Sequence, residues 1–168
     1  MILGIDPGRD KTGWAFVGFS GELLCSGIFP SDEWGSFIGI LEKPTNLWET
    51  SLALWQLEKQ KSLVTPSGEP RSLQYIAVGD GTGSKEATAC LKRLEYKIVS
   101  ANEERTTLIA RDLYWCIHRP AFWQKCLPRF LRGPARDLDD LAAWAIALRS
   151  IKDFRLAKSE LGRLINLF

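Results

Sequence analysis

The chain has 168 residues, 45% of them hydrophobic, with 22 Lys and Arg against 20 Asp and Glu. That length predicts a single domain over residues 1–168 that can bury a core without disulfides or metal. The small net charge does not by itself identify a partner, and four scattered cysteines with one histidine argue against a structural zinc site.

Three strands come first, over residues 1–6, 12–19 and 22–29, and turns that contain glycine join them as antiparallel hairpins. The first strand is apolar throughout, which is typical of a strand buried on both faces. Asp6 follows this apolar run, Pro7 keeps Asp6 extended, and Gly8 allows the backbone to approach a ligand closely. This turn is where a metal or phosphate site would be expected, and the alternative is a turn aspartate that caps its own loop.

The rest of the chain alternates helices and strands. Ser84 is expected to cap a helix that buries Ala87, Cys90, Leu91 and Leu94. The further elements expected are a helix over 47–63, a loop over 65–71, a strand over 73–78, the helix from Ser84, a strand over 96–100, a helix from Thr106 or Thr107, a long loop, a helix from Asp137, and a last amphipathic helix with Ala157, Leu161, Leu164, Ile165 and Phe168 on its apolar face.

Charge is distributed unevenly along the chain. Residues 1–104 carry a net −4 and residues 105–168 a net +6. The long loop between the helices from Thr106 and Asp137 is basic and aromatic, and three of its cations are candidates for contact with a phosphate backbone: Lys125, Arg129 and Arg132. The alternative is an ordinary loop whose arginines lie over the core.

Acidic residues follow or precede several elements. Asp6, Asp80 and Glu103 come after the first, fourth and fifth strands, and Asp137 and Asp140 open a late helix. If those three strands are parallel neighbours, their carboxyl ends meet at one edge of the sheet, where ligands of open α/β sheets bind. Each acid has a structural explanation by itself, as a turn residue or a helix cap. Their joint placement favours a metal site.

These motifs resemble the RuvC/YqgF branch of the ribonuclease-H-like superfamily, and YqgF-like Holliday junction resolvases most closely. The resemblance rests on ILGIDPGRDKTGWA at the start, VGDGTGS at 78–84, NEERTTLIAR at 102–111 and DLDDLAAWA at 137–145. It implies an α/β fold with a five-stranded mixed sheet in the order 3-2-1-4-5, flanked by helices. It also implies an enzyme, a nuclease that depends on Mg²⁺ or Mn²⁺.

The resemblance assigns roles to five acids. Asp6 matches the first-strand aspartate that would bridge two metal ions, and Glu103 or Asp80 would hold one ion while Asp140, with Asp137, would hold the other. Asp80 stands where RuvC resolvases carry a longer glutamate, which favours Glu103, so the expected metal ligands are Asp6, Glu103 and Asp140. The residues expected to contact a substrate phosphate, besides the basic loop, are Gly8, Thr82, Gly83, Ser84 and Lys85.

The implied function is hydrolysis of phosphodiester bonds in a four-way DNA junction or a structured precursor rRNA, as in Holliday junction resolution or the processing of pre-16S rRNA. One alternative is a catalytically silent nucleic-acid-binding module of the same fold. The other is an ATP-binding domain of the actin and Hsp70 type, whose first strand also ends in D-x-G. The protein is expected to be cytoplasmic, without membrane contact, and a monomer or a homodimer.

Overall fold

The structure is a computed structural model that describes residues 1–103, 106–118, 134 and 136–165, with the backbone alone over 156–165. The strands are β1 (Ile2–Pro7), β2 (Lys11–Val17), β3 (Leu23–Pro30), β4 (Gln56–Lys59), β5 (Tyr75–Gly79) and β6 (Lys97–Ala101). The helices are α1 (Trp34–Leu41), α2 (Trp48–Leu52), α3 (Ser84–Leu91), α4 (Thr106–Ile117) and α6 (Asp139–Ile165), with short 3-10 turns at Ser31–Glu33, Thr45–Leu47 and Lys92–Leu94.

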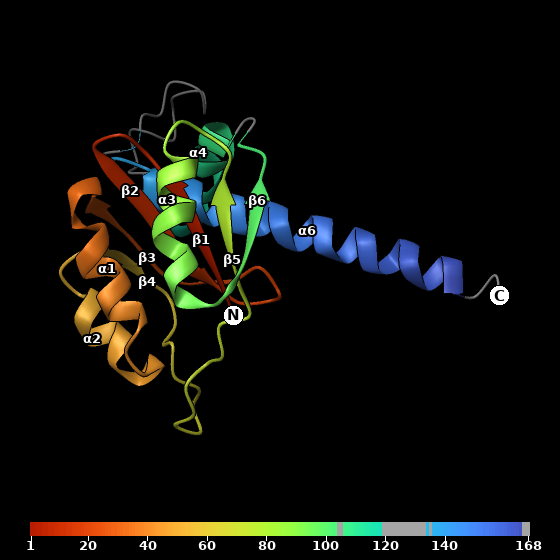
Figure 1. The fold of residues 1–168 in the computed structure, drawn as a ribbon, viewed down its shortest axis with the longest axis horizontal. Helices are drawn as coiled ribbons and strands as arrows, with labels where there is room; N and C mark the ends of the chain where they lie inside the picture. The colour runs from red at the N-terminus through yellow and green to blue at the C-terminus, as the bar shows by residue number, and fades with distance from the viewer. Residues whose placement is uncertain (104–105, 119–133, 135, 166–168) are drawn as a thin grey trace.

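The strands of the described residues form one mixed sheet in the order β4-β3-β2-β1-β5-β6 (Figure 1). β1 to β4 pair antiparallel in sequence, whereas β5 lies parallel to β1 and β6 parallel to β5. The predicted order 3-2-1-4-5 is therefore confirmed, because β5 and β6 are the expected fourth and fifth strands. The ribonuclease-H-like fold class is confirmed with one extra edge strand, β4.

Helices cover both faces of this sheet. One buried cluster joins α1, α2 and α3 to the sheet residues Leu3, Ile5 and Ile76, and a second cluster joins α4 and α6 to Ile2 and Ala77 on the opposite face. Successive residues of a strand point to opposite faces, so an apolar β1 serves both clusters at once. The core therefore lies in two layers, one on each side of β1 and β5.

The helix expected over 47–63 was wrong. Its apolar pattern included Leu47 and Leu54, which are 47% and 85% exposed, and only the five residues Trp48–Leu52 are α-helical. β4 then pairs with β3 along Cys25 to Gly27. A four-residue edge strand with one buried side chain lacks the alternation that identifies strands in a sequence.

Helix α1 was not predicted at all. Its eight residues include two glycines, which disfavour helix in a sequence-based reading. The helix is held by tertiary packing instead, since Phe37 is fully buried and its ring lies 4.4 Å from that of Phe29 on β3.

The two late helices expected from the sequence are one continuous helix, α6, which begins at Asp139 rather than Asp137. No proline or glycine interrupts residues 139–161, so nothing in the chain stops the helix. In Figure 1 α6 crosses behind the sheet and its C-terminal part extends beyond it. The expected apolar face from Ala157 to Phe168 lies outside the residues whose side chains are described.

Two glycines bring α6 close to the sheet. A Cβ at Gly4 of β1 would collide with the carbonyl oxygen of Ala143, and one at Gly13 of β2 would collide with that of Asp139. The first turn of α6 therefore lies directly on β2 at Gly13, which is paired with Asp6 across the β1–β2 ladder.

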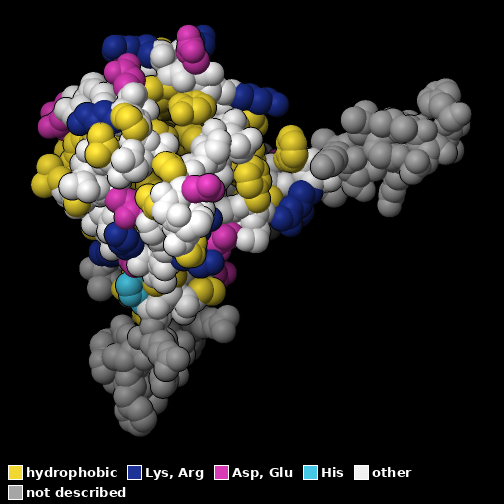
Figure 2. Space-filling model, turned by 90° about the horizontal axis from the view of Figure 1, so that it is seen from below, with side chains coloured by type: hydrophobic (Ala, Val, Ile, Leu, Met, Phe, Trp, Pro, Cys, Tyr) yellow, Lys and Arg dark blue, Asp and Glu magenta, His cyan; other side chains and the backbone are white. Residues whose placement is uncertain are grey.

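The surface carries charges of both signs. Figure 2, which views the molecule from below in Figure 1, shows Lys and Arg side chains interspersed with Asp and Glu and with hydrophobic side chains. Among the described helices, none is both long and apolar enough to cross a bilayer.

Candidate functional site

The carboxyl ends of three parallel strands meet at one edge of the sheet. Ile5 pairs with Val78, and Gly79 pairs with Ala101, so β1, β5 and β6 end side by side. Asp6 lies at the end of β1, Asp80 directly follows β5, and Glu103 lies two residues beyond β6. The parallel arrangement on which the sequence argument depended is therefore present.

Asp6 is partly buried at this edge, and its electrostatic environment is unfavourable for a carboxylate. Burial, then the nearby charges of Glu103 and Asp139, raise the pKa of Asp6 to about 7. A carboxylate in such surroundings is stabilised either by a proton or by a nearby cation.

Glu103 is placed by two glycines. A Cβ at Gly79 or at Gly81 would collide with the Glu103 carboxyl group, so the side chain lies over the backbone at the end of β5. Burial raises the pKa of Glu103, the Gly81 N–H opposes this by donating to the carboxylate, and Asp80 raises it further. The Oε1 atom of Glu103 is buried without a hydrogen-bond partner in the described part of the chain.

Asp80 has a different position from Glu103. It is exposed, and its Oδ1 accepts a hydrogen bond from the Glu103 backbone N–H at 2.9 Å. Asp80 thereby fixes the chain where Glu103 leaves β6. The geometry favours Glu103 over Asp80 as the acid that faces Asp6.

Asp140 does not take part in this group. Its side chain is fully buried, it pairs with Arg136 at 2.7 Å, and its Oδ2 accepts a hydrogen bond from Ser26 at 2.7 Å. A guanidinium and a hydroxyl already satisfy this carboxylate. The spacing of Arg136 and Asp140, four residues apart, is the sequence signal that indicates such a pair.

Asp139, which sequence reasoning missed, faces Asp6 instead. It contributes to the raised pKa of Asp6 and lines a small pocket with Asp6 and Gly8. No periodicity distinguishes Asp139 from Asp140, because the residues from Leu141 to Ala147 are all buried. The docking of the first turn on Gly13 decides which acid faces the end of β1.

Two cations, Arg9 and Lys11, line this pocket, and Lys11 pairs with acids there. Its Nζ lies 2.7 Å from Asp137 and 3.0 Å from Asp139, and the hydrogen bond to Asp137 is the main reason that the pKa of Lys11 is raised. Asp137 is exposed and points to Lys11. Among the described residues, no three His, Cys, Asp or Glu side chains form a ready metal-binding group.

The residues expected to contact phosphate lie close to this edge. A Cβ at Gly83 would lie 2.7 Å from the Pro7 carbonyl oxygen, so the turn before α3 packs against the end of β1. Gly83, rather than Ser84, is the N-cap of α3, and Thr82 and Lys85 are exposed on either side. The Gly8 N–H donates to the Lys11 carbonyl oxygen. The basic residues Lys125, Arg129 and Arg132 lie outside the described residues.

Comparisons with known proteins give weak matches. No family model matches the chain. No curated protein matches it either. Two solved structures of RuvC from Thermus thermophilus, one in complex with a Holliday junction substrate, are 14% and 15% identical, both with a TM-score of 0.47. The match to the complex covers 88% of this chain and 90% of that RuvC chain, and the other match covers 93% of this chain and 96% of that RuvC chain.

A ROK family transcriptional regulator, described as a homolog of the E. coli MLC protein, matches at 13% identity with a TM-score of 0.38. That match covers 67% of this chain and 30% of the regulator. At these identities and scores none of the three similarities assigns a function, and the fold class rests on the strand order and directions described above.

Proposed function

We propose that this domain is a divalent-metal-dependent endonuclease that hydrolyses phosphodiester bonds of structured nucleic acid. The observation that carries the proposal is the placement of Asp6, Glu103 and Asp139 at one edge of the sheet, where burial and the two other acids raise the pKa of Asp6. A bound cation would relieve this repulsion. Carboxylates gathered beside a small pocket are typical of metal-assisted hydrolysis.

The acids present fit Mg²⁺ or Mn²⁺, which prefer oxygen ligands. Asp6, Glu103 and Asp139 would hold the ion, with Asp139 in the place that the sequence assigned to Asp140. The buried, unpartnered Oε1 of Glu103 is an oxygen available for such a ligand. Mg²⁺ commonly takes one or two carboxylates and completes its shell with water and substrate phosphate, so a ready group of three acids is not required.

When bound, the ion would supply a Lewis acid that activates water and stabilises charge at the leaving oxygen. The chain itself would hold the substrate phosphate through backbone N–H groups at the start of α3, which packs against Pro7 beside Asp6. We assign His118 no role as a base, because its Nε2 lies 2.7 Å from Glu58 on the edge strand β4 and His118 does not line the pocket of Asp6. The substrates proposed remain a four-way DNA junction and a structured precursor rRNA.

A second candidate is a nucleic-acid-binding module without activity. Two observations favour it: Arg136 neutralises Asp140, and Lys11 lies 3.0 Å from Asp139, where a metal ion would otherwise compensate the charge. Such a module would bind nucleic acid without any requirement for a divalent ion.

Three Asp→Asn variants separate these functions. With Mn²⁺, we expect the wild type to cut at least one of the two substrates. Asp6→Asn and Asp139→Asn should each lower the rate by on the order of a hundredfold, since even indirect partners of a catalytic metal are worth about 10- to 100-fold. Asp140→Asn should retain activity in proportion to its folded fraction, and Asp153→Asn, an exposed residue about 21 Å along α6 from Asp139, is the matched control.

Thermal unfolding gives a readout that does not depend on cleavage. Mn²⁺ should raise the Tm of the wild type and of Asp153→Asn but not that of Asp6→Asn, because ligands that bind only the folded state stabilise it. A wild type that neither cuts the two substrates nor responds to Mn²⁺ would be the silent module instead. Loss of activity in Asp140→Asn with activity retained in Asp139→Asn would instead support Asp140 as the metal ligand, as the sequence predicts.

A further inference from the structure

A groove runs away from the candidate site between α3 and the edge strand β6. It begins at Gly79 and Asp80, continues past Thr88, and ends near Lys92, with a volume of about 520 Å³. Asp80 accepts the backbone N–H of Glu103, so the groove opens directly beside the acids proposed to hold the metal. A ligand in the groove would be continuous with a phosphate at that site.

Two lysines line this groove without an acidic partner. Lys85 and Lys92 are exposed, and neither forms an ion pair within the described part of the chain. They are seven residues apart along one helical stretch, which places them two turns, or about 10 Å, apart on the same side. In contrast, Lys11 and Arg136 are both held by carboxylates. Asp80 also lines the groove, so its three charged residues carry a net positive charge, which suits a negatively charged ligand.

The neutral walls of the groove restrict the class of that ligand. Val78 and Ile98 give an apolar floor, while Ser84, Thr88 and Ser100 carry hydroxyl groups along it. Cations two turns apart suit an extended chain with repeated charges better than a single small anion. The volume is that of a site for a drug-sized molecule, comparable to one or two nucleotides.

We propose that this groove binds a single strand of nucleic acid as it leaves the cleavage site, with Lys85 and Lys92 on successive stretches of its phosphate backbone. This proposal rests on the proposed function, because the acids proposed to bind the metal are what identify the start of the groove as the cleavage site. DNA and RNA share the phosphate chemistry that the lysines recognise, so both are tested.

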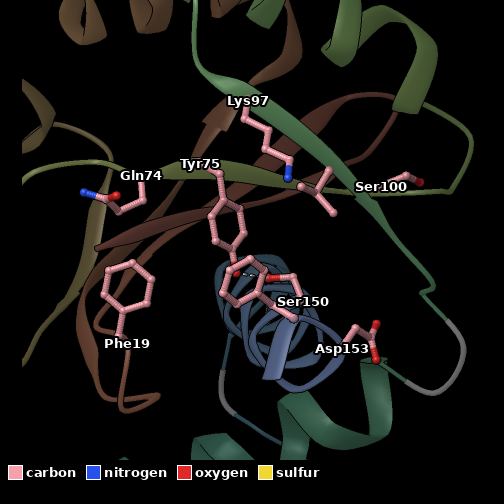
Figure 3. A pocket seen from close by; sticks show the side chains of 9 residues that line it. Phe19, Gln74, Tyr75, Lys97, Ser100, Ser150 and Asp153 are labelled. Carbon is pink, nitrogen blue, oxygen red and sulfur yellow. Dashed lines mark hydrogen bonds between the residues drawn. The ribbon is translucent and has the colours of Figure 1, made fainter. Parts of the chain in front are cut away.

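The other face of β6 supplies a matched control. Lys97 lines a separate cavity with Phe19, Tyr75 and Phe154, because alternate residues of a strand point to opposite faces (Figure 3). Tyr75 and Ser150 are hydrogen-bonded there at 3.2 Å. Lys97→Ala removes one lysine charge from the same edge of the molecule, at a residue that does not line the groove.

The test measures binding of labelled poly(dT) and poly(U) strands by fluorescence anisotropy in EDTA, over a range of salt concentrations. We expect Lys85→Ala/Lys92→Ala to weaken binding about tenfold at low salt, and to make the slope of log K against log salt shallower by roughly 1.4, about 0.7 per lost phosphate contact. Lys97→Ala should bind as the wild type does. A labelled duplex should bind more weakly than either strand.

Several results would contradict the proposal that this groove binds a single strand. They are a wild type that binds neither strand, a double variant that binds as tightly as the wild type, and a Lys97→Ala variant that is weakened equally. Cleavage is scored separately on the same proteins. If the protein cuts nothing but its binding depends on Lys85 and Lys92, the groove proposal is supported and the nuclease proposal is contradicted. If the protein cuts and the double variant leaves cleavage unaffected, the nuclease proposal is supported and the groove proposal is contradicted.

Discussion

At the scale of single residues, the central feature is the partly buried carboxylate of Asp6, which forms no ion pair within the described residues. The pKa of Asp6 is raised from 3.8 to about 7, mainly by burial and then by Glu103 and Asp139. The folded protein therefore binds a proton at Asp6 more tightly than the unfolded chain does. Without metal, Asp6 favours folding below its unfolded pKa, and this contribution is lost as the pH rises through about 7.

Asp6→Asn should therefore stabilise the metal-free protein at high pH. Above pH 7 we expect its free energy of unfolding to exceed that of the wild type by on the order of 2 kcal/mol in EDTA, while below pH 3.8 the two should agree. Urea denaturation at a series of pH values measures the difference. If the free energies of unfolding of both proteins change in parallel between pH 3.8 and pH 7, the prediction is contradicted, because the surroundings then do not disfavour the Asp6 carboxylate.

The site residues were predictable to different degrees. Asp6 follows an apolar strand in a glycine turn, and Glu103 follows the last strand, so strand ends alone bring both to one edge. The choice between Glu103 and Asp80 depends on the space above Gly79 and Gly81, which no spacing in the sequence expresses. Asp139 was missed because the rotation of α6 is set by contact with Gly13.

At the scale of elements, the position of α6 depends on close contact with the sheet. Gly4 lies at the centre of β1, and a Cβ there would collide with the backbone of Ala143 and approach the side chain of Ala147. A backbone atom cannot move aside as the end of a flexible side chain can. Small residues on both surfaces therefore fix the distance between helix and sheet, and with it the height of Asp139 above Asp6.

Gly4→Ala should therefore be destabilising by about 1–3 kcal/mol, the usual cost of overpacking a core. Gly39→Ala is the matched control, since its Cβ would meet nothing within 4 Å in the interior of α1. There the same change should stabilise the protein by roughly 0.5–1 kcal/mol, because alanine favours helix over glycine. Chemical denaturation of the two variants beside the wild type compares the signs. An equal effect at both positions would contradict the contact.

The elements themselves followed the sequence where local patterns decide. The hairpins β1 to β3 and the strands β5 and β6 have apolar runs bounded by turns, and all were predicted. β4 and α1 were not, because β4 exists only by pairing with β3 and α1 only by burying aromatic side chains such as Phe37 against the sheet. Both depend on partners distant in the chain, which sequence periodicity does not reveal.

At the scale of the whole molecule, one ionic network joins three separate elements. Glu58 of β4 accepts Arg136 and His118 at 2.7 Å each, and Arg136 also pairs with Asp140 at the start of α6. His118 directly follows α4, so Glu58 and Arg136 connect the edge of the sheet to both helices of the second layer. Asp140 is fully buried, which makes the network depend on Arg136.

Arg136→Met should be strongly destabilising. Removal of the guanidinium leaves the Asp140 carboxylate buried with only Ser26 to support it, and such broken buried pairs cost about 3–5 kcal/mol. Arg93→Met is the matched control, because Arg93 is 69% exposed and lies 3.8 Å from Glu42, where a surface pair is worth about 0–1 kcal/mol.

A double-mutant cycle with Asp140→Asn separates the lost pair from lost packing. The double variant Asp140→Asn/Arg136→Met should recover at least about 1 kcal/mol relative to the sum of the single changes, because the unpaired charge is then gone. Strict additivity in urea denaturation would mean that Arg136 acts instead through other contacts, such as that of its guanidinium with the Tyr114 ring 5.8 Å away. Because the network holds the first turn of α6, Arg136→Met should also weaken the Mn²⁺ stabilisation that depends on Asp139, whereas Arg93→Met should not.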